Sequence, residues 1–228
     1  MIDHDRKLIF IHAPRTGGTS VEVALFGKDW WWIDSETKHI TAEEARYKYY
    51  SKAWDEYHKF TVVRNSWDWM DSLYWSHHKK RTRDKPWKEW LQNPTLMPHE
   101  QPFSPITVMA EGVDTFLRLE SLEPDLNKML KKLGLDPVKV PHRQARQDKF
   151  RDDLRNRYDD DDIEQVRKLL LPDIERFNYS FPSRGLGDTI SKITSKVGVK
   201  PCGGCKRRAK KLNKMVPYKK QSVEKEEN

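Results

Sequence analysis

A glycine turn flanked by hydroxyl and guanidinium side chains lies near the start of the chain, in Ala13-Pro14-Arg15-Thr16-Gly17-Gly18-Thr19-Ser20. Backbone N–H groups of such a turn at a helix N-terminus form an anion site, because the unpaired donors and the helix dipole point the same way. Its side chains add donors from Arg15, Thr16, Thr19 and Ser20. The segment predicts a site for a doubly charged oxyanion, although Gly17-Gly18 alone also fits a simple turn. It lacks the G-x-x-x-x-G-K-S/T spacing of nucleotide hydrolases.

A second pair of anion-binding side chains follows a second apolar run, Phe60-Thr-Val-Val63. Arg64 leaves the C-terminal end of this predicted strand, which is where ligands bind in open α/β sheets. Ser72 comes eight residues later, about two helical turns along the next predicted helix, and faces the same side if that helix folds back. The pair predicts a second phosphate site, although an Arg and a Ser taken alone are more often a surface pair.

A parallel sheet is the structure that would bring these residues together. Two strand-turn-helix units are predicted: Lys7–His12 followed by a helix from the glycine turn to Phe26, and Phe60–Val63 followed by a helix over Trp67–His78. The third strand is expected at Thr115–Leu119, with helices over Glu123–Leu133 and Asp161–Leu171, the second ended by Pro172. The pattern predicts an α/β fold with a central parallel sheet flanked by helices.

Two further segments have local signals. Thr41-Ala-Glu-Glu44 has the pattern of a capping box, which predicts a helix start. Residues 79–105 contain five prolines together with Lys, Arg and Trp, and we expect an irregular surface or substrate loop there.

The charge of the chain is unevenly distributed. The 228 residues carry a net charge of +8, yet residues 183–228 alone hold 13 Lys and Arg against 4 Asp and Glu. The chain therefore divides into a nearly neutral body, residues 1–182, and a basic C-terminal tail, residues 183–228. No apolar run approaches the roughly 20 residues needed to span a bilayer, and Met1–Lys7 has no secretory pattern. We expect a soluble cytoplasmic protein without a membrane contact.

The two anion-binding motifs carry a family resemblance. The run Phe10-Ile-His-Ala-Pro-Arg-Thr-Gly-Gly-Thr-Ser20 resembles the 5′-phosphosulfate loop of the sulfotransferase family that includes the carbohydrate (family 2 type) sulfotransferases. The run Phe60-Thr-Val-Val-Arg-Asn-Ser-Trp-Asp-Trp-Met-Asp-Ser-Leu-Tyr74 resembles its 3′-phosphate motif. Weaker similarity continues through Phe116–Asn127 and Asp173–Phe181, so that the resemblance covers residues 7–182.

The resemblance implies a P-loop-like sulfotransferase fold and a defined reaction. A sulfuryl group would move from 3′-phosphoadenosine 5′-phosphosulfate (PAPS) to an acceptor hydroxyl, with a carbohydrate as the family-level acceptor and no metal required. It assigns the 5′-phosphosulfate to Arg15, Thr16, Gly17, Gly18, Thr19 and Ser20, and the 3′-phosphate to Arg64 and Ser72. The family usually has Lys at the position of Arg15. A guanidinium stays protonated, so we expect Arg15 to neutralise the leaving phosphate and to preserve donor binding better than rate.

The reaction needs a base for the acceptor proton, and the ideal pKa near neutrality favours histidine. His39 lies in Lys38-His39-Ile-Thr-Ala42, which resembles a Lys-His-x-Thr-Ala element found in part of the family, and we assign it the catalytic role. The alternative for His39 is a contact with the helix start at Thr41. His12 is the second candidate base. Glu22 is the third, although a residue at its position is usually solvated.

Aromatic and basic clusters have two interpretations each. Trp30-Trp31-Trp32 and the set Trp67, Trp69 and Trp75 are core residues at helical spacing, or surfaces that stack adenine or a sugar ring. The run His77–Arg81 is a solvated face or an anion-binding surface.

The tail has its own motifs. Gly185–Thr194, Lys200–Arg208 and Lys210–Lys214 resemble a short C-terminal element of various phage-encoded proteins, which would place the protein in a phage or its bacterial host. Cys202 and Cys205 supply half of a tetrahedral zinc site, and no Cys or His follows them. A zinc shared between chains, a redox pair and a simple turn all remain open. The basic residues would contact an acidic partner or nucleic acid, which gives an alternative function: a catalytically weakened nucleotide-binding adaptor.

Overall fold

The computed structural model describes residues 1–78, 85–96, 101–141, 154–183, 185–196, 198 and 202–218. The chain divides into two compact units, one of Met1–Gln147 with Asp162–Ser180, and the other of Asp148–Asp161 with Phe181–Asn228. In the described residues, no helix combines the length and the apolar character needed to cross a membrane.

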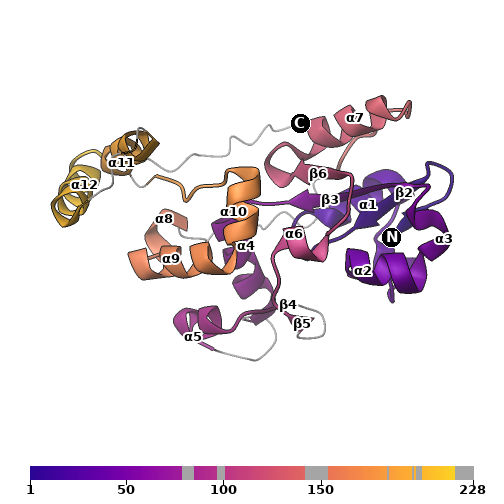
Figure 1. Ribbon diagram of the computed structural model, residues 1–228, viewed down its shortest axis with the longest axis horizontal. Coiled ribbons are helices and arrows are strands. Elements are labelled where there is room, and N and C mark those ends of the chain that lie inside the picture. The colour runs from indigo at the N-terminus through magenta and orange to yellow at the C-terminus, as the bar shows by residue number, and fades with distance from the viewer. Residues whose placement is uncertain are drawn as a thin grey trace. The chain divides into compact units, whose positions relative to one another are not determined.

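The first unit is built on a four-stranded sheet with the strand order β1-β2-β3-β6 (Figure 1). Its strands are β1 (Ile2–Asp3), β2 (Leu8–Ile11), β3 (His58–Val63) and β6 (Thr115–Arg118). β3 runs parallel to both β2 and β6, and β1 is antiparallel to β2. The α/β class and the three predicted strands are therefore confirmed. The sheet is mixed rather than wholly parallel, because the short β1 adds an antiparallel edge.

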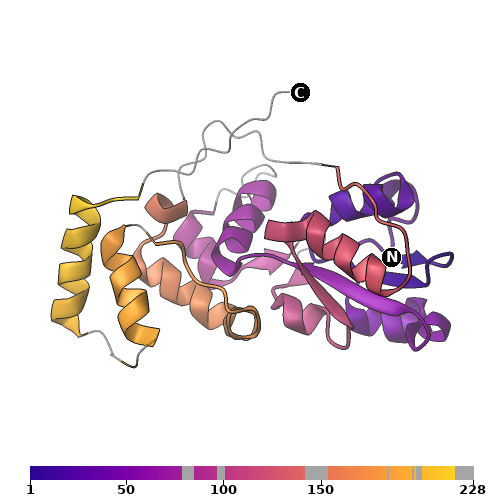
Figure 2. The ribbon, with the colours of Figure 1, turned by 90° about the horizontal axis from the view of Figure 1, so that it is seen from above.

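Both faces of the sheet are buried, as is usual where helices connect parallel strands. Along β2, Leu8 and Phe10 enter one hydrophobic cluster and Ile9 and Ile11 enter another. The first cluster includes apolar side chains of α1 (Gly18–Phe26) and α7 (Leu122–Lys132). The second includes side chains of α2 (Ala42–Glu44) and α3 (Ser51–Trp54). Figure 2 shows α7 lying over the sheet against which it packs.

The predicted helices are present, with two corrections at their ends. α4 (Ser66–Leu73) continues as a π-helical turn over Tyr74–His78. α9 (Asp160–Leu169) is followed at once by α10 (Leu171–Phe177), whose first turn contains Pro172. The prediction of one helix that runs to Leu171 and is ended by Pro172 was wrong, because α9 ends at Leu169 and Pro172 lies in the first turn of α10, where a proline loses no intrahelical hydrogen bond.

The prediction of irregular structure over residues 79–105 was wrong for much of its described part. This part contains α5 (Trp87–Gln92), β4 (Thr95–Leu96) and β5 (Gln101–Pro102), and α6 (Ile106–Met109) follows. Trp90 and Leu91 are each only 1% exposed, so their burial stabilises a helix that begins just after Pro86. Residues 79–84 and 97–100 lie outside the described ranges.

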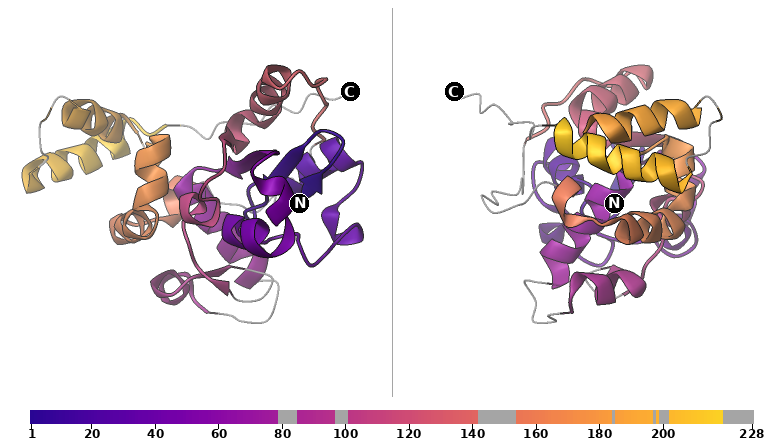
Figure 3. Two further views of the ribbon diagram at one scale, coloured as in Figure 1. Left: turned by 45° about the vertical axis from the view of Figure 1, so that its right-hand side comes forward. Right: turned by 90° about the vertical axis from the view of Figure 1, so that its left-hand side faces the viewer.

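The second unit contains α8 (Leu154–Arg157), α11 (Leu186–Lys196) and α12 (Gly203–Met215). α11 and α12 lie side by side, as Figure 3 shows. A Cβ atom on Gly187 would come within 2.1 Å of the Ala209 carbonyl oxygen, so the two helices touch through their backbones. Asn213 Oδ1 accepts from the Asp188 backbone N–H at 2.9 Å, and Asn213 Nδ2 donates to Asp188 Oδ1 at 2.6 Å. The segment predicted as a basic tail therefore contains a packed helical hairpin.

Candidate functional site

The loop between β2 and α1 is tightly wound. Arg15 has a φ of 65° and Gly17, the N-cap residue of α1, has a φ of 84°, both in the left-handed region. For a residue with a Cβ this region costs roughly 1–2 kcal/mol, and such costs concentrate at ligand sites. In the first turn of α1 the Ser20 N–H donates to the Gly17 carbonyl oxygen at 3.0 Å, whereas the N–H groups of Gly18 and Thr19 have no acceptor within the helix. The loop therefore places backbone donors where the sequence predicts an oxyanion.

Thr16 shapes this loop from within. Its hydroxyl donates to the Ala13 carbonyl oxygen at 2.8 Å, and the side chain is fully buried. The sequence predicts that this hydroxyl donates to an anion, but in the structure its proton is used by the Ala13 carbonyl oxygen. Thr19 is half-buried and Ser20 is buried in the first turn of α1.

Gly18 is required by its neighbour His12. A Cβ atom at position 18 would come within 2.1 Å of the imidazole Cδ2 of His12, so no other residue fits without moving the ring. The loop between β2 and α1 consequently lies directly against His12, the residue that follows β2.

The two predicted phosphate motifs meet in one place. Arg15 Nε donates to Ser72 Oγ at 3.3 Å, and Arg64 Nη1 donates to the Arg15 carbonyl oxygen at 2.9 Å, a contact between residues 49 apart in the chain. Trp69 Nε1 donates to the Pro14 carbonyl oxygen at 2.7 Å and holds α4 against the loop. The residues thus form one cluster at the carboxyl ends of β2 and β3, the edge of an α/β sheet where ligands bind.

Arg64 also has an acidic neighbour. Its Nε and Nη2 each lie 2.6 Å from Asp68 Oδ2, one helical turn into α4. Asn65 caps that helix, because its Oδ1 accepts from the Trp67 N–H at 3.2 Å. Any anion at Arg64 therefore competes with the Asp68 carboxylate. The i, i+4 spacing of Arg64 and Asp68 was the sequence signal for this pair.

His39 is held beside the same strand end. Its Nδ1 lies 3.1 Å from the His12 carbonyl oxygen, and a carbonyl only accepts, so Nδ1 carries the proton and Nε2 carries the lone pair. Burial, followed by the charge of His12, lowers the pKa of His39 well below its ordinary value. His39 is therefore a neutral imidazole that can accept a proton at Nε2.

The helix start at Thr41 does not need His39. Thr41 Oγ1 accepts from the Glu44 N–H at 3.2 Å, and Glu44 Oε2 accepts from the Thr41 N–H at 2.7 Å. The predicted capping box is confirmed, and the recorded polar contact of His39 is with His12 instead.

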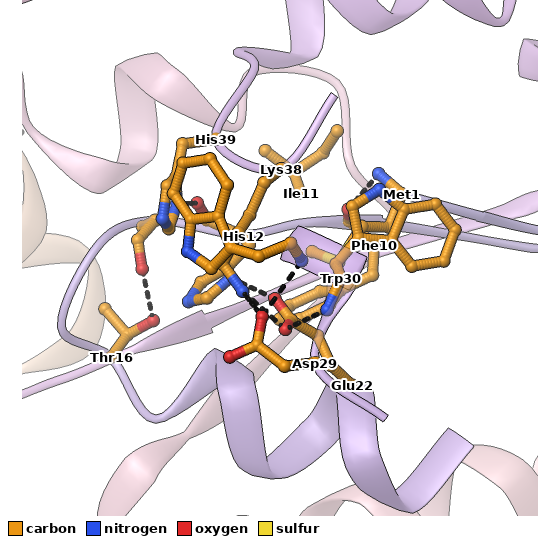
Figure 4. A network of polar contacts seen from close by, with 12 residues as sticks. Met1, Phe10, Ile11, His12, Thr16, Glu22, Asp29, Trp30, Lys38 and His39 are labelled. Carbon is orange, nitrogen blue, oxygen red and sulfur yellow. Dashed lines mark hydrogen bonds and ion pairs between the residues drawn. The ribbon is translucent and has the colours of Figure 1, made fainter. Parts of the chain in front are cut away.

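A polar network of His12, Glu22, Lys38 and Asp29 lies next to His39 (Figure 4). Glu22 is 0% exposed; its Oε1 accepts from His12 Nδ1 at 2.6 Å, and its Oε2 accepts from Lys38 Nζ at 2.6 Å. Lys38 is 2% exposed and also contacts Asp29 Oδ1 at 2.5 Å. The expectation that Glu22 is solvated was wrong, because these donors balance its charge in the interior. The role of Lys38 was missed, since a lysine in a polar sequence gives no sign of burial.

The network fixes protonation states. Burial raises the pKa of Glu22, but the hydrogen bond and charge of His12, together with the hydrogen bonds from Lys38 and from the Trp30 N–H, outweigh burial and lower that pKa to about 2. Burial lowers the pKa of His12, and Glu22 opposes this effect. Glu22 and His12 therefore hold each other in the interior beside His39, and His39 remains the candidate proton acceptor.

The tryptophans divide into buried and exposed sets. Trp30, Trp67 and Trp69 are buried, as the core interpretation predicted, and Trp75 is half-buried. Trp31 and Trp32 are 42% and 81% exposed, so that interpretation was wrong for these two. The Trp31 ring lies 5.8 Å from that of His39, edge to face. An exposed aromatic surface therefore borders the candidate base. The side chains of His77–Arg81 lie outside the described residues.

Comparison with protein-family models, curated proteins and solved structures finds no match to this chain. Within the parts of the chain that the structure describes, no three His, Cys, Asp or Glu side chains gather as metal ligands. Function is therefore inferred from the geometry of the site and from the sequence motifs.

Proposed function

We propose that the protein is a PAPS-dependent sulfotransferase that transfers a sulfuryl group to a hydroxyl of a carbohydrate, on a P-loop-like sulfotransferase fold. The observation that carries this proposal is the contact between the two motifs, in which Arg64 donates to the Arg15 carbonyl oxygen and Arg15 donates to Ser72. A donor with phosphate groups at both its 5′ and 3′ positions needs two anion sites close together, and the meeting of the two motifs in one cluster supports the proposal that they bind these groups.

The donor would be held mainly by backbone and guanidinium groups. The amides of Gly18 and Thr19 and the guanidinium of Arg15 would face the 5′-phosphosulfate, and Arg64 would face the 3′-phosphate together with Ser72, whose Oγ accepts from Arg15 Nε. As in phosphoryl transfer, catalysis depends on positioning and on stabilising charge, so no metal is required.

The transfer step uses His39 and Arg15. His39 Nε2 takes the proton of the acceptor hydroxyl, whose oxygen then bonds to the donor sulfur. The bond between sulfur and the bridging oxygen breaks, and the electron pair stays on the departing 5′-phosphate. Arg15 neutralises that charge without giving up a proton.

Binding of 3′-phosphoadenosine 5′-phosphate, the donor without its sulfuryl group, tests the proposal. We expect calorimetry to give a micromolar dissociation constant, and Arg64→Ala to weaken binding about 10- to 100-fold, because hydrogen bonds to charged groups contribute roughly 1.5–3 kcal/mol. Asp68→Asn removes the competing carboxylate and should strengthen binding several-fold.

Arg167→Ala is the matched control, since Arg167 is exposed and pairs with Glu164 on α9. Undetectable binding by the unmodified chain, or equal binding by Arg64→Ala, contradicts a donor site here. Labelled-sulfate transfer to a panel of glycans, lipids and small alcohols then identifies the acceptor.

Trp31 and Trp32 support a carbohydrate acceptor, since a sugar ring packs its apolar face on an exposed indole. We expect Trp32→Ala to raise the KM for a carbohydrate acceptor about 2- to 12-fold, the equivalent of 0.5–1.5 kcal/mol for one aromatic contact. Affinity for 3′-phosphoadenosine 5′-phosphate should not change. Tyr47→Ala, which removes another exposed aromatic ring, is the control. Steady-state kinetics with equal KM values for both variants would exclude Trp32 from the acceptor site.

A further inference from the structure

The only two cysteines of the chain lie together at the start of α12. Cys202 is the N-cap residue of this helix, and its Sγ accepts from the Cys205 N–H at 3.4 Å. The two sulfur atoms are 3.4 Å apart. Cys202 is exposed and Cys205 is half-buried, so a reagent in solvent reaches Cys202 first.

The surroundings favour the thiolate form of Cys202. A helix N-terminus stabilises negative charge. The hydrogen bond from the Cys205 N–H, followed by the contact with the Cys205 side chain, lowers the pKa of Cys202. Arg208 Nη2 lies 3.8 Å from Cys205 Sγ and adds a positive charge beside the second sulfur.

The helix that carries the pair is fixed in its register. The backbone contact of Gly187 with Ala209 and the paired hydrogen bonds of Asp188 with Asn213 hold α12 against α11. Both sulfur atoms therefore stand on a packed hairpin, where their separation is defined by the first turn of the helix.

A metal site would need more than this chain provides in the described residues. Two thiolates are half of a tetrahedral zinc site, and no third ligand gathers with them in the ranges that the structure describes. A dithiol needs only the two residues that are already in contact. The exposed first sulfur and the less exposed second sulfur also match the unequal roles of an attacking thiol and a resolving thiol.

We propose that Cys202 and Cys205 form a redox-active dithiol that exchanges with low-molecular-weight disulfides, of which oxidised glutathione is the probe. The Cys202 thiolate attacks one glutathione sulfur, the glutathione S–S bond breaks, and one glutathione leaves and takes up a proton. Cys205, having lost its proton, attacks Cys202 Sγ and displaces the second glutathione. The pair is oxidised by two electrons to a disulfide, and oxidised glutathione is reduced to two thiols.

The full-length chain tests this reaction, because every thiol signal comes from the pair. Incubation with oxidised glutathione should give a monomer that has lost two hydrogen atoms by mass spectrometry and no longer reacts with a maleimide; dithiothreitol should restore both thiols. Cys205→Ser should accumulate a glutathione adduct. Near neutral pH it should react about tenfold faster than Cys202→Ser, because only Cys202 is the exposed N-cap thiol.

Arg208→Gln and Lys211→Gln form a matched pair on α12, since both remove one charge and only Arg208 approaches a cysteine. Arg208→Gln should slow disulfide formation several-fold and Lys211→Gln should not. Equal rates for the two single-cysteine variants, disulfide-linked dimers in place of the internal disulfide, or binding of one zinc ion by two chains would each overturn the proposal.

Discussion

Replacing His39 by alanine is expected to lower the turnover number of sulfuryl transfer by about 10²- to 10⁴-fold, the usual contribution of a positioned general base. Affinity for 3′-phosphoadenosine 5′-phosphate should stay nearly unchanged, because the hydrogen bond of His39 goes to the His12 carbonyl oxygen, whereas Arg64 and Ser72 contact Arg15. Single-turnover kinetics with labelled donor, together with calorimetry, separate these two effects.

A glutamine at position 39 distinguishes proton transfer from positioning. Its amide N–H can still donate to the His12 carbonyl oxygen, but its side chain cannot take up a proton, so His39→Gln should be as slow as His39→Ala. His4→Ala removes an exposed histidine and serves as the control, since His4 follows Asp3, which pairs with Leu8 at the opposite end of β2 from His12. An equal loss of turnover and donor affinity in His39→Ala would assign His39 a structural role instead.

The pH dependence of turnover follows from the direction of the pKa shift. His39 must be neutral to accept the proton, and its pKa lies well below 6.5 in the folded protein. Turnover should therefore be flat through neutral pH and fall only on the acid side, as His39 becomes protonated.

Replacing Glu22 by glutamine is expected to destabilise the fold by about 3 kcal/mol at pH 7. The carboxyl pKa falls from 4.5 to about 2 on folding, and each unit corresponds to about 1.4 kcal/mol. The physical reason is that Lys38 and His12 would lose the carboxylate that balances them in the interior. Urea unfolding at pH 7 measures the difference, with the exposed Glu36→Gln as control.

The sign of the pH effect gives a second check on Glu22. A carboxyl whose pKa is lowered on folding contributes its full stability above the unfolded pKa of 4.5 and loses it as the pH falls toward 2. The gap between the unmodified chain and Glu22→Gln should therefore shrink between about pH 5 and pH 2. A gap that stays constant over this range would show that the loss comes from packing and not from the charge.

The sheet and its main helices could be predicted because they are specified locally. A continuous apolar run, Leu8–Ile11, defines β2, and the pattern over Leu122–Lys132 defines a helix with one buried face. The short elements could not be predicted in this way. α5 depends on burial of Trp90 against the rest of the unit, and β1 is a two-residue edge without a pattern of its own.

The residues of the candidate site also divide into those that the local sequence predicts and those whose position depends on distant contacts. Arg15 and Arg64 follow the ends of two neighbouring parallel strands, so topology alone predicts that they meet, whereas Ser72 joins them because α4 packs back against the loop. Lys38 lies in a polar stretch, whereas Glu22 is the one charged residue of the otherwise uncharged α1, and the burial of both depends on partners that are distant in the sequence. Their network needed three-dimensional information, because hydrogen-bond partners, and not residue types, decide whether a charge can be buried.

His12 contacts both the loop that would bind the sulfuryl donor and the histidine that would take the acceptor proton. Its ring packs on Gly18 at the anion-binding loop, and its carbonyl oxygen holds the His39 ring. A thermal displacement of the end of β2 would carry the loop and His39 in the same direction. The spacing between an acceptor oxygen on His39 and a sulfur atom over the loop would then stay constant while the sheet around them fluctuates. Because both groups rest on His12, the acceptor and the donor sulfur would stay aligned on the ångström scale, where small errors of position cause large losses of rate.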